Sequence, residues 1–533
     1  MKRLAAALAI FAVVFSVLCI SDVLSAETSD SEEQEFTDGC FTYAILQGTD
    51  VELVKYTEDK NNPLTTVEVP ETVMWSDHQY EVVQISDGAF SDCQKVQTIM
   101  IPKSVRDITE SAFSAQCISC FKVSSENSTY YATESDGILY EKGSNNLVRY
   151  PPSKAGESYT VTNNVSKIEP GAFAYSLYLK EVFIGENVLR LGDYAFSDCY
   201  KLETVSFSGS GLGIIGIGAF YNCTALKTIN LPPELLTIGD LAFCSCKSLA
   251  EIEIPGSVIS IGDGVFRHCE SLAKFIVDED NAKYTVYENA LCVLDTQSKI
   301  KTLIAFPAAC TLDNGADLVE YTIPSTINDI LPYAFSDSHI TKLCLPAGLS
   351  EIGAMAFAEM TSLTDVEIPK TVTKINLGAF THCTSLKYID TGVNTYQIED
   401  MAFMGCTSLK EVVLHENLYS ISDWAFSETA IESIVIPSSV GLLGASVFGH
   451  CENLTYIEIE SKDVTATDTF DMKEMSQTVT VKCYDGALKD TGTVSDNVVF
   501  EYFDKKTFPM MNIVGIVACL LILFGILNFL RRI

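Results

Sequence analysis

Basic residues, histidine and tryptophan are scarce in this sequence. Its 533 residues include 35 lysines and arginines, six histidines and two tryptophans, against 70 aspartates and glutamates, so the formal net charge is −35. A surface of this sign repels the phosphates of nucleic acids, and we therefore predict no nucleic-acid partner. Charged residues make up only 20% of the chain and hydrophobic residues 47%. This balance excludes an acidic disordered tail and leaves ample material for a core.

Signatures of catalysis and of cofactor binding are also missing. The chain has no Gly-x-Ser-x-Gly elbow, no His-Glu-x-x-His pair and no phosphate-binding Gly-x-x-x-x-Gly-Lys loop. Gly211 to Gly216 match the dinucleotide fingerprint Gly-x-Gly-x-x-Gly, but Ile215-Gly216 belongs to the repeat described below rather than to a strand–helix unit. We therefore expect no enzyme, no cofactor and no metal site.

Both ends of the chain carry an apolar segment. Residues 1–26 have the basic, apolar and small-residue order of a cleaved secretory signal, although the apolar run also suits an uncleaved anchor. Residues 509–530 are long enough for one transmembrane helix, which leaves residues 531–533 as a cytoplasmic tail. A lipid-anchor signal with attachment near Ser495 is the alternative. The sequence thus predicts a single-pass plasma-membrane protein with its ectodomain outside the cell.

A repeat dominates the remainder of the chain. An Ala-Phe or Val-Phe pair recurs thirteen times, mostly 22–24 residues apart, with Ile or Leu always five residues before the Phe. A Leu-x-x-Ile-x-Ile pattern, often followed by Pro, begins six residues after most of these phenylalanines. The repeated phenylalanines are Phe90, Phe113, Phe173, Phe196, Phe220, Phe243, Phe266, Phe335, Phe357, Phe380, Phe403, Phe426 and Phe448.

One copy of this repeat predicts one short strand and one turn. The Ile-x-Ile alternation places two side chains on the same face of a strand, and the Pro ends the strand because it has no N–H to donate. The Ala-Phe pair then returns to the interior. A single copy cannot bury its own apolar face, so the copies must stack into a parallel sheet. The pattern therefore predicts a leucine-rich-repeat solenoid, a curved rod with strands ~4.8 Å apart.

Two long gaps between copies, after Phe113 and after Phe266, resemble each other and predict two inserted hairpins. Alternating stretches before and after the array predict terminal β caps. The expected organisation is an N-terminal cap over residues 27–78, repeats over residues 79–460, and a C-terminal cap and stalk over residues 461–508.

The cysteines follow the repeat. Eight of them stand three residues after a repeat phenylalanine, a phase that predicts a ladder of small, buried free thiols rather than disulfides. The most plausible disulfide joins two cysteines outside this phase, Cys292 and Cys310. His268, His382 and His450 also share one phase, but they lie three or more copies apart, at least ~14 Å at the spacing of a sheet, which is too far for one metal ion.

The copy Ile-Gly-x-x-Ala-Phe-x-x-Cys-x-x-Leu-x-x-Ile-x-Ile-Pro, as it stands from Ile238 to Pro255, resembles the BspA-like (Treponema-type) leucine-rich repeat. This resemblance covers about residues 79–460. It implies a surface antigen, and several members of the family are adhesins for host matrix proteins or other microbes.

The candidate ligand-binding residues flank the inward Ile of each strand, because side chains alternate across a strand. On these outward rows carboxylates lie beside Tyr, Ile and Val, a mixture that is favoured at interfaces. We expect the rows to lie on the concave sheet. The candidate residues are Glu251, Glu253, Asp365, Glu367, Tyr388, Asp390, Glu411, Tyr456 and Glu458.

Two functions of different classes fit the sequence. The first is an adhesin that binds an extracellular protein or glycan through the concave sheet. The second is a structural or shielding coat antigen without a tight ligand, in which the acidic rows only prevent sheets from associating. A signalling receptor fits poorly, because a tail of three residues recruits little.

Overall fold

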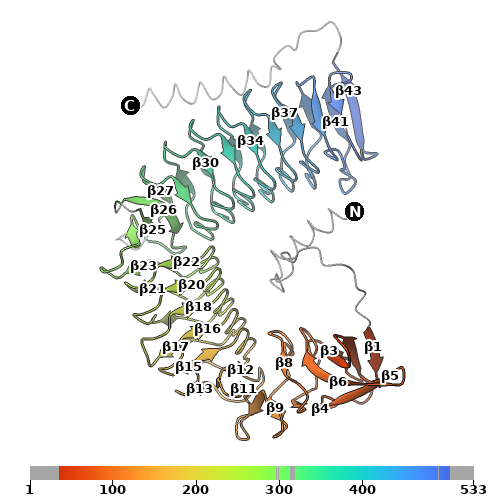
Figure 1. Ribbon diagram of the computed structural model, residues 1–533. Helices are drawn as coiled ribbons and strands as arrows, with labels where there is room; N and C mark the ends of the chain where they lie inside the picture. The colour runs from red at the N-terminus through yellow and green to blue at the C-terminus, as the bar shows by residue number, and fades with distance from the viewer. Residues whose placement is uncertain (1–34, 296, 298, 312–317, 490, 504–533) are drawn as a thin grey trace.

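The computed structural model describes residues 35–295, 297, 299–311, 318–489 and 491–503. These residues form a curved solenoid built from β-strands, with no α-helix among them (Figure 1). The solenoid has about 18 turns of about 23 residues, more than the thirteen copies read from the sequence, because the insertions and the terminal segments add turns of their own. No helix in the described part of the chain could span a membrane. The predicted signal and transmembrane segments lie outside the described residues.

Each regular turn contains two strands, where the sequence pattern predicts one. The first, called here the long strand, carries the Ile-x-Ile alternation. The long strands are β7 (Thr98–Ile101), β9 (Cys120–Val123), β13 (Ser158–Thr160), β15 (Glu181–Ile184), β17 (Thr204–Phe207), β19 (Thr228–Ile229), β21 (Glu251–Ile254), β23 (Lys274–Val277), β27 (Glu320–Thr322), β29 (Lys342–Cys344), β31 (Asp365–Glu367), β33 (Tyr388–Asp390), β35 (Glu411–Val413), β37 (Ser433–Ile436), β39 (Tyr456–Ile459), β41 (Val479–Cys483) and β43 (Val498–Tyr502).

The second strand, called here the short strand, ends in most turns at the Ile or Leu that stands five residues before the repeat phenylalanine. It pairs in parallel with the same strand of the next turn. The short strands are β8 (Asp107–Ile108), β14 (Lys167–Ile168), β16 (Arg190–Leu191), β18 (Ile214–Ile215), β20 (Thr237–Ile238), β22 (Ser260–Ile261), β28 (Asp329–Ile330), β30 (Glu351–Ile352), β32 (Lys374–Ile375), β34 (Gln397–Ile398), β36 (Ser420–Ile421), β38 (Leu442–Leu443), β40 (Val464–Ala466) and β42 (Leu488–Lys489).

The two ends of the solenoid differ. At the N-terminus, β1 (Glu35–Asp38), β2 (Phe41–Ile45), β3 (Asp50–Tyr56), β6 (His78–Ile85) and β5 (Thr72–Trp75) form a mostly antiparallel sheet, while β4 (Thr66–Glu68) pairs in parallel with β7. At the C-terminus, the two stacks simply continue through β40 to β43. The segment predicted as a separate C-terminal cap therefore begins as further turns of the same solenoid.

Both long gaps contain the predicted hairpins. The first insertion forms β10 (Tyr130–Ala132), β11 (Leu139–Glu141) and β12 (Leu147–Arg149), and the second forms β24 (Tyr284–Tyr287), β25 (Ala290–Leu294) and β26 (Ile300–Ala305). In each insertion the first two strands are antiparallel and the last pairs in parallel with the following short strand. Each insertion is therefore a decorated turn that rejoins the stack of short strands.

The core of the solenoid is a ladder of stacked phenylalanine rings. Phe380, Phe403 and Phe426 are fully buried, and their ring centroids follow one another at 5.4 and 5.2 Å with planes within 4° of parallel. This spacing is close to the ~4.8 Å between paired strands, so rings and strands repeat together. In the two insertions Tyr150 and Phe306 occupy the place of a repeat phenylalanine and stack on the next ring at 5.2 Å.

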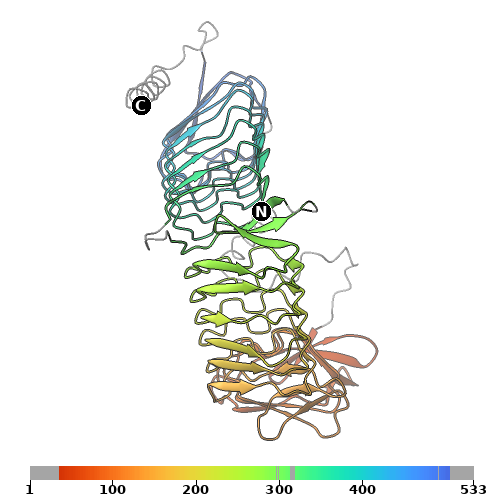
Figure 2. The same cartoon turned by 90° about the vertical axis from the view of Figure 1, so that its left-hand side faces the viewer.

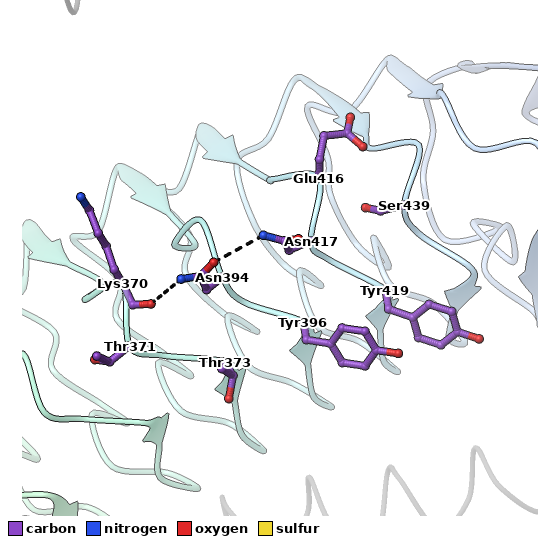
Figure 3. Close-up of a pocket in the computed structure, with 9 residues that line it drawn as sticks. All are labelled: Lys370, Thr371, Thr373, Asn394, Tyr396, Glu416, Asn417, Tyr419 and Ser439. Atoms are coloured by element: carbon purple, nitrogen blue, oxygen red, sulfur yellow. Dashed lines mark hydrogen bonds between the residues drawn. The ribbon is translucent and has the colours of Figure 1, made fainter.

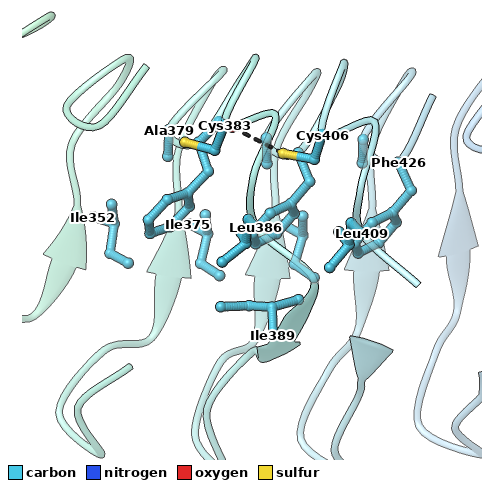
Figure 4. Packing of buried hydrophobic residues seen from close by; sticks show 14 of the residues in the cluster. Ile352, Ile375, Ala379, Cys383, Leu386, Ile389, Cys406, Leu409 and Phe426 are labelled. Carbon is cyan, nitrogen blue, oxygen red and sulfur yellow. Dashed lines mark hydrogen bonds between the residues drawn. The ribbon is translucent and has the colours of Figure 1, made fainter. Parts of the chain in front are cut away.

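The repeated cysteines are free and buried, as the sequence predicts, and they also form hydrogen bonds. The thiol of Cys406 donates to the carbonyl oxygen of Phe380 in the preceding turn at 3.1 Å, and Cys383 donates to Phe357 at 3.2 Å. Figure 4 shows Cys383 and Cys406 among the buried side chains of the core. Every cysteine in the described part of the chain is a free thiol. The predicted Cys292–Cys310 disulfide is therefore wrong: both thiols lie separately in the core of the second insertion.

Removing one ring from the phenylalanine ladder should destabilise the solenoid strongly. Phe403→Ala leaves a cavity between two stacked rings, and we expect it to lower the free energy of unfolding by about 3–5 kcal/mol. The control is Phe183→Ala, because Phe183 is 41% exposed on a long strand, and we expect a loss below about 1 kcal/mol. Denaturant unfolding measures both, and equal losses would contradict a ring-stacked core.

Thiol labelling should separate the cysteine ladder from the surface. Burial raises the pKa of the Cys383 thiol well above its ordinary value and that of Cys93 to about 12, so neither is a thiolate near neutral pH. Cys344 is exposed on β29. We expect iodoacetamide at pH 8 to modify Cys344 in the folded protein and the ladder cysteines only after denaturation. Peptide mass spectrometry checks this, and rapid labelling of Cys383 in folded protein would contradict it.

Candidate functional site

The predicted outward rows lie on the long strands, which run along the outer side of the arc in the half of the solenoid from β13 to β23. In Figure 1, β15, β17, β21 and β23 lie toward the left, outer edge, and β16, β18, β20 and β22 lie further in. Figure 2 views the molecule from that outer side and shows long strands running across the face turned to the viewer. The predicted concave position is therefore wrong in this half of the solenoid. Strand alternation indicates which side chains point outward, whereas the direction of curvature depends on the packing of the whole turn.

The first pair of candidate residues, Glu251 and Glu253, lies on β21 beside β23. Glu251 is opposite Lys274 in the strand register and forms an ion pair with it at 2.8 Å. Glu253 is opposite Ile276, which is 36% exposed. One of the two carboxylates is therefore neutralised by the next turn.

The central candidates form one contiguous group on β31, β33 and β35. Tyr388 is opposite Glu411 in the register, it is 39% exposed, and β31 with Asp365 and Glu367 lies beside β33. Burial raises the pKa of the Tyr388 phenol, and the charges of Asp390 and Glu411 raise it further. The phenol therefore lies among carboxylates on the exposed face.

Asp390 has a structural role as well. Its Oδ1 accepts a hydrogen bond from the backbone N–H of Gly392 at 2.9 Å and lies 2.6 Å from Nε2 of His415. Gly392 has a positive φ of 91°, so this carboxylate holds a turn that an L residue adopts with difficulty. Asp390 is therefore less available to a ligand than its neighbours.

The last pair of candidates, Tyr456 and Glu458 on β39, does not form an open surface. Glu458 is only 7% exposed, and its Oε2 accepts a hydrogen bond from the Tyr456 hydroxyl at 2.6 Å. Lys482 on the next long strand lies 3.7 Å from the same oxygen. Burial and the bond to Glu458 raise the pKa of Tyr456. The outward position of Glu458 is thus covered by its neighbours, which the strand period alone does not reveal.

Sequence reasoning missed a second exposed surface, on the loops between long and short strands. Tyr396 and Tyr419 are 54% and 46% exposed, and their rings stack at 5.3 Å with planes 6° apart. They line a shallow depression of about 670 Å³ together with Lys370, Asn394 and Asn417 (Figure 3). The signal for this surface is present in the chain, since the two tyrosines are 23 residues apart, each directly before a short strand.

The backbone fixes the distance between the two tyrosines. The N–H of Tyr396 donates to the carbonyl oxygen of Thr373, and the N–H of Tyr419 donates to that of Tyr396, both at 2.8 Å. The N–H of Gly441 donates in turn to Tyr419 at 2.9 Å. Thr373, Tyr396, Tyr419 and Gly441 thus occupy the same position in four successive turns.

The structure contains no arrangement that points to metal chemistry in residues 35–503 as far as they are described: no group of three or more His, Cys, Asp or Glu side chains is placed to hold an ion. Both candidate surfaces instead present hydroxyls, amides, carboxylates and aromatic rings to solvent. Such groups recognise a ligand by hydrogen bonding and ring contact.

The chain matches the family model described as the BspA type leucine rich repeat region, over residues 61–135, 153–289, 310–395 and 379–483. No curated protein matches it. Among solved structures, it is similar to a leucine rich cell surface protein from Faecalibacterium prausnitzii, with 22% identity over 81% of this chain and 96% of that one and a TM-score of 0.44.

Two further structures are similar to the chain at lower scores. The pneumococcal vaccine antigen PcpA is 19% identical over 88% of this chain and 99% of that one, with a TM-score of 0.40. The T. pallidum leucine rich repeat protein is 18% identical over 61% of this chain and 86% of that one, with a TM-score of 0.23.

The covered position of Glu458 can be tested by removing its hydroxyl partner. We expect Tyr456→Phe to lower the free energy of unfolding by about 1–3 kcal/mol, because a buried carboxylate loses a hydrogen bond. The matched control is Tyr388→Phe, which removes a hydroxyl from a more exposed tyrosine and should change the stability by less than about 0.5 kcal/mol. Denaturant midpoints compare the two variants, and a larger effect at Tyr388 would contradict this assignment.

Proposed function

Because the chain belongs to the BspA-type leucine-rich repeat family, we propose that it is a cell-surface adhesin that binds an extracellular protein or glycan through its long strands. The observation that carries the proposal is the group formed by Asp365, Glu367, Tyr388 and Glu411. These residues lie on three neighbouring strands, and their side chains point away from the core. The signal and membrane segments predicted from the sequence support a location at the cell surface.

This group is not needed by the fold. Within the described residues, Asp365, Glu367 and Glu411 form no ion pair, whereas many other carboxylates along the solenoid pair with a lysine of a neighbouring turn, as Glu203 does with Lys227. Asp365 is opposite Lys342 in the strand register but forms no ion pair with it. Like charges gathered on one face repel each other and lower stability. They create a negative potential that a cationic ligand surface would complement, with Tyr388 as an aromatic anchor among them.

Charge reversal tests this surface. We expect the triple variant Asp365→Lys, Glu367→Lys and Glu411→Lys to lose at least about tenfold in affinity for the ligand, because the potential of the face changes sign. Asp390 is left unchanged because it supports the turn at Gly392. The full chain is first screened against arrays of extracellular-matrix proteins and glycans, and the variant is then compared on the hits.

The control carries the same change in net charge at exposed loop positions: Glu134→Lys, Glu279→Lys and Glu474→Lys. Its affinity should match that of the unmodified chain. If both variants bind equally well, the long-strand face is not the ligand site. If the folded, unmodified chain binds nothing on either array, the adhesin proposal fails and a shielding coat antigen is favoured.

A further inference from the structure

The tyrosine stack on the loop surface is closed at one end and open at the other. At Gly441 an added Cβ atom would lie 2.7 Å from Cε2 of Tyr419, so the Tyr419 ring covers this glycine. At the other end the neighbouring position is Thr373, whose hydroxyl donates away from the stack to the carbonyl oxygen of Ser350 at 3.3 Å. Figure 3 shows the two rings side by side, with Thr373 in the position before Tyr396. One face of Tyr396 is therefore exposed at the open end of the stack.

The fold does not require aromatic side chains at this position. The same place is occupied by Ser350, Thr373 and Gly441 in neighbouring turns, all of which keep the backbone hydrogen bond of the ladder. Two large rings that are about half exposed lose part of the hydrophobic stabilisation that full burial would bring. In more distant turns this place is taken by Leu189, Leu236 and Ile259, which are about as exposed as the tyrosines. Tyr396 and Tyr419 are thus the aromatic members of a variable, exposed position from which the core gains little.

Polar side chains line the rest of the depression, with one positive and one negative charge among them. The amide of Asn394 donates to the carbonyl oxygen of Lys370 at 2.8 Å, and that of Asn417 donates to Val393 at 2.7 Å, which fixes both side chains. Within the described residues, the Lys370 ammonium group and the two tyrosine hydroxyls have no hydrogen-bond partner. The cation of Lys370 is matched by the carboxylate of Glu416, so the depression has no net charge.

The geometry points to a saccharide-binding site in this depression, with a pyranose ring stacked on the open face of Tyr396. The C–H face of a sugar ring is flat and apolar and suits an aromatic platform, whereas its edge carries hydroxyls. The tyrosine hydroxyls can bond these hydroxyls, and a neutral ligand suits a depression whose lining has no net charge. Because the depression is shallow and follows the turns, a chain of several sugars can lie along it.

This inference does not depend on the proposed adhesive face, which lies on the long strands. A peptide is the other ligand for an exposed aromatic pair, but a peptide hot spot is a fully desolvated pocket with an apolar core. The depression is instead open and rimmed by amides and hydroxyls. A neutral oligosaccharide fits these groups better.

Two variants test the site from opposite directions. Tyr396→Ala removes the platform, and we expect it to weaken saccharide binding about tenfold or more. Thr373→Tyr places another ring on the open face of Tyr396, and we expect it to abolish binding while leaving the protein folded and at least as stable. Tyr396→Phe keeps the platform and should retain binding within about threefold. Tyr502→Ala is the control, since Tyr502 is 57% exposed on β43.

The probes are hexasaccharides of glucose, mannose, galactose and N-acetylglucosamine, titrated calorimetrically into the full chain in a detergent without a sugar headgroup. Binding of at least one probe, lost in Tyr396→Ala and Thr373→Tyr and kept in the control, supports the site. Absence of binding by every probe at millimolar concentration overturns it, as does binding that survives Thr373→Tyr. Loss in the Asp365, Glu367 and Glu411 variant alone would assign the sugar to the long-strand face instead.

Discussion

The stacking of one buried phenylalanine ring on the next is the interaction on which the rest of this structure depends. Phe403 and Phe426 repeat at 5.2 Å, which is close to the ~4.8 Å that backbone hydrogen bonds impose on paired strands. Core and backbone therefore advance by the same step in every turn. Any side chain that recurs at one position must then form a ladder of its own. The repeated cysteines form such a ladder in the core, in which the thiol of Cys406 reaches the carbonyl oxygen of the preceding Phe380.

The two insertions interrupt this common step, and each interruption is bridged by an arginine, which is buried at the first insertion and partly buried at the second. At the first, Arg149 donates to the carbonyl oxygens of Phe113 and Ala174 on either side of the gap, at 2.9 and 3.3 Å. At the second, Arg267 forms a two-pronged ion pair with Glu359, 92 residues away, and lies over the ring of Tyr333 at 4.1 Å. The buried core divides into three clusters that meet within these insertions. Charged side chains thus connect the turns on either side of each insertion, where the ladder of stacked rings is interrupted.

The sequence predicts the parts of this structure that repeat, because a repeat reports the same local environment many times. The solenoid, the buried phenylalanines and the free cysteines follow from the period of the repeated sequence pattern alone. Features that depend on contact between particular turns do not. The burial of Glu458 arises from Tyr456 beside it and Lys482 in the next turn. The exposed stack of Tyr396 on Tyr419 arises because two adjacent turns carry tyrosine at the same exposed position. The direction of curvature is likewise a property of the whole turn rather than of one strand.

A repeat scaffold therefore separates stability from recognition in a way that a single globular core does not. The position before the short strand accepts Ser350, Thr373, Tyr396, Tyr419 and Gly441 in five consecutive turns, with the same backbone hydrogen bonds. Substitution at such a position changes the surface and leaves the ladder of rings intact. Residues that serve recognition are consequently found where a turn differs from its neighbours, and residues that serve stability where it agrees with them. In this molecule the stacked tyrosines and the carboxylates of Asp365, Glu367 and Glu411 near Tyr388 are features of this kind, and it is on them that we base the proposed binding surfaces.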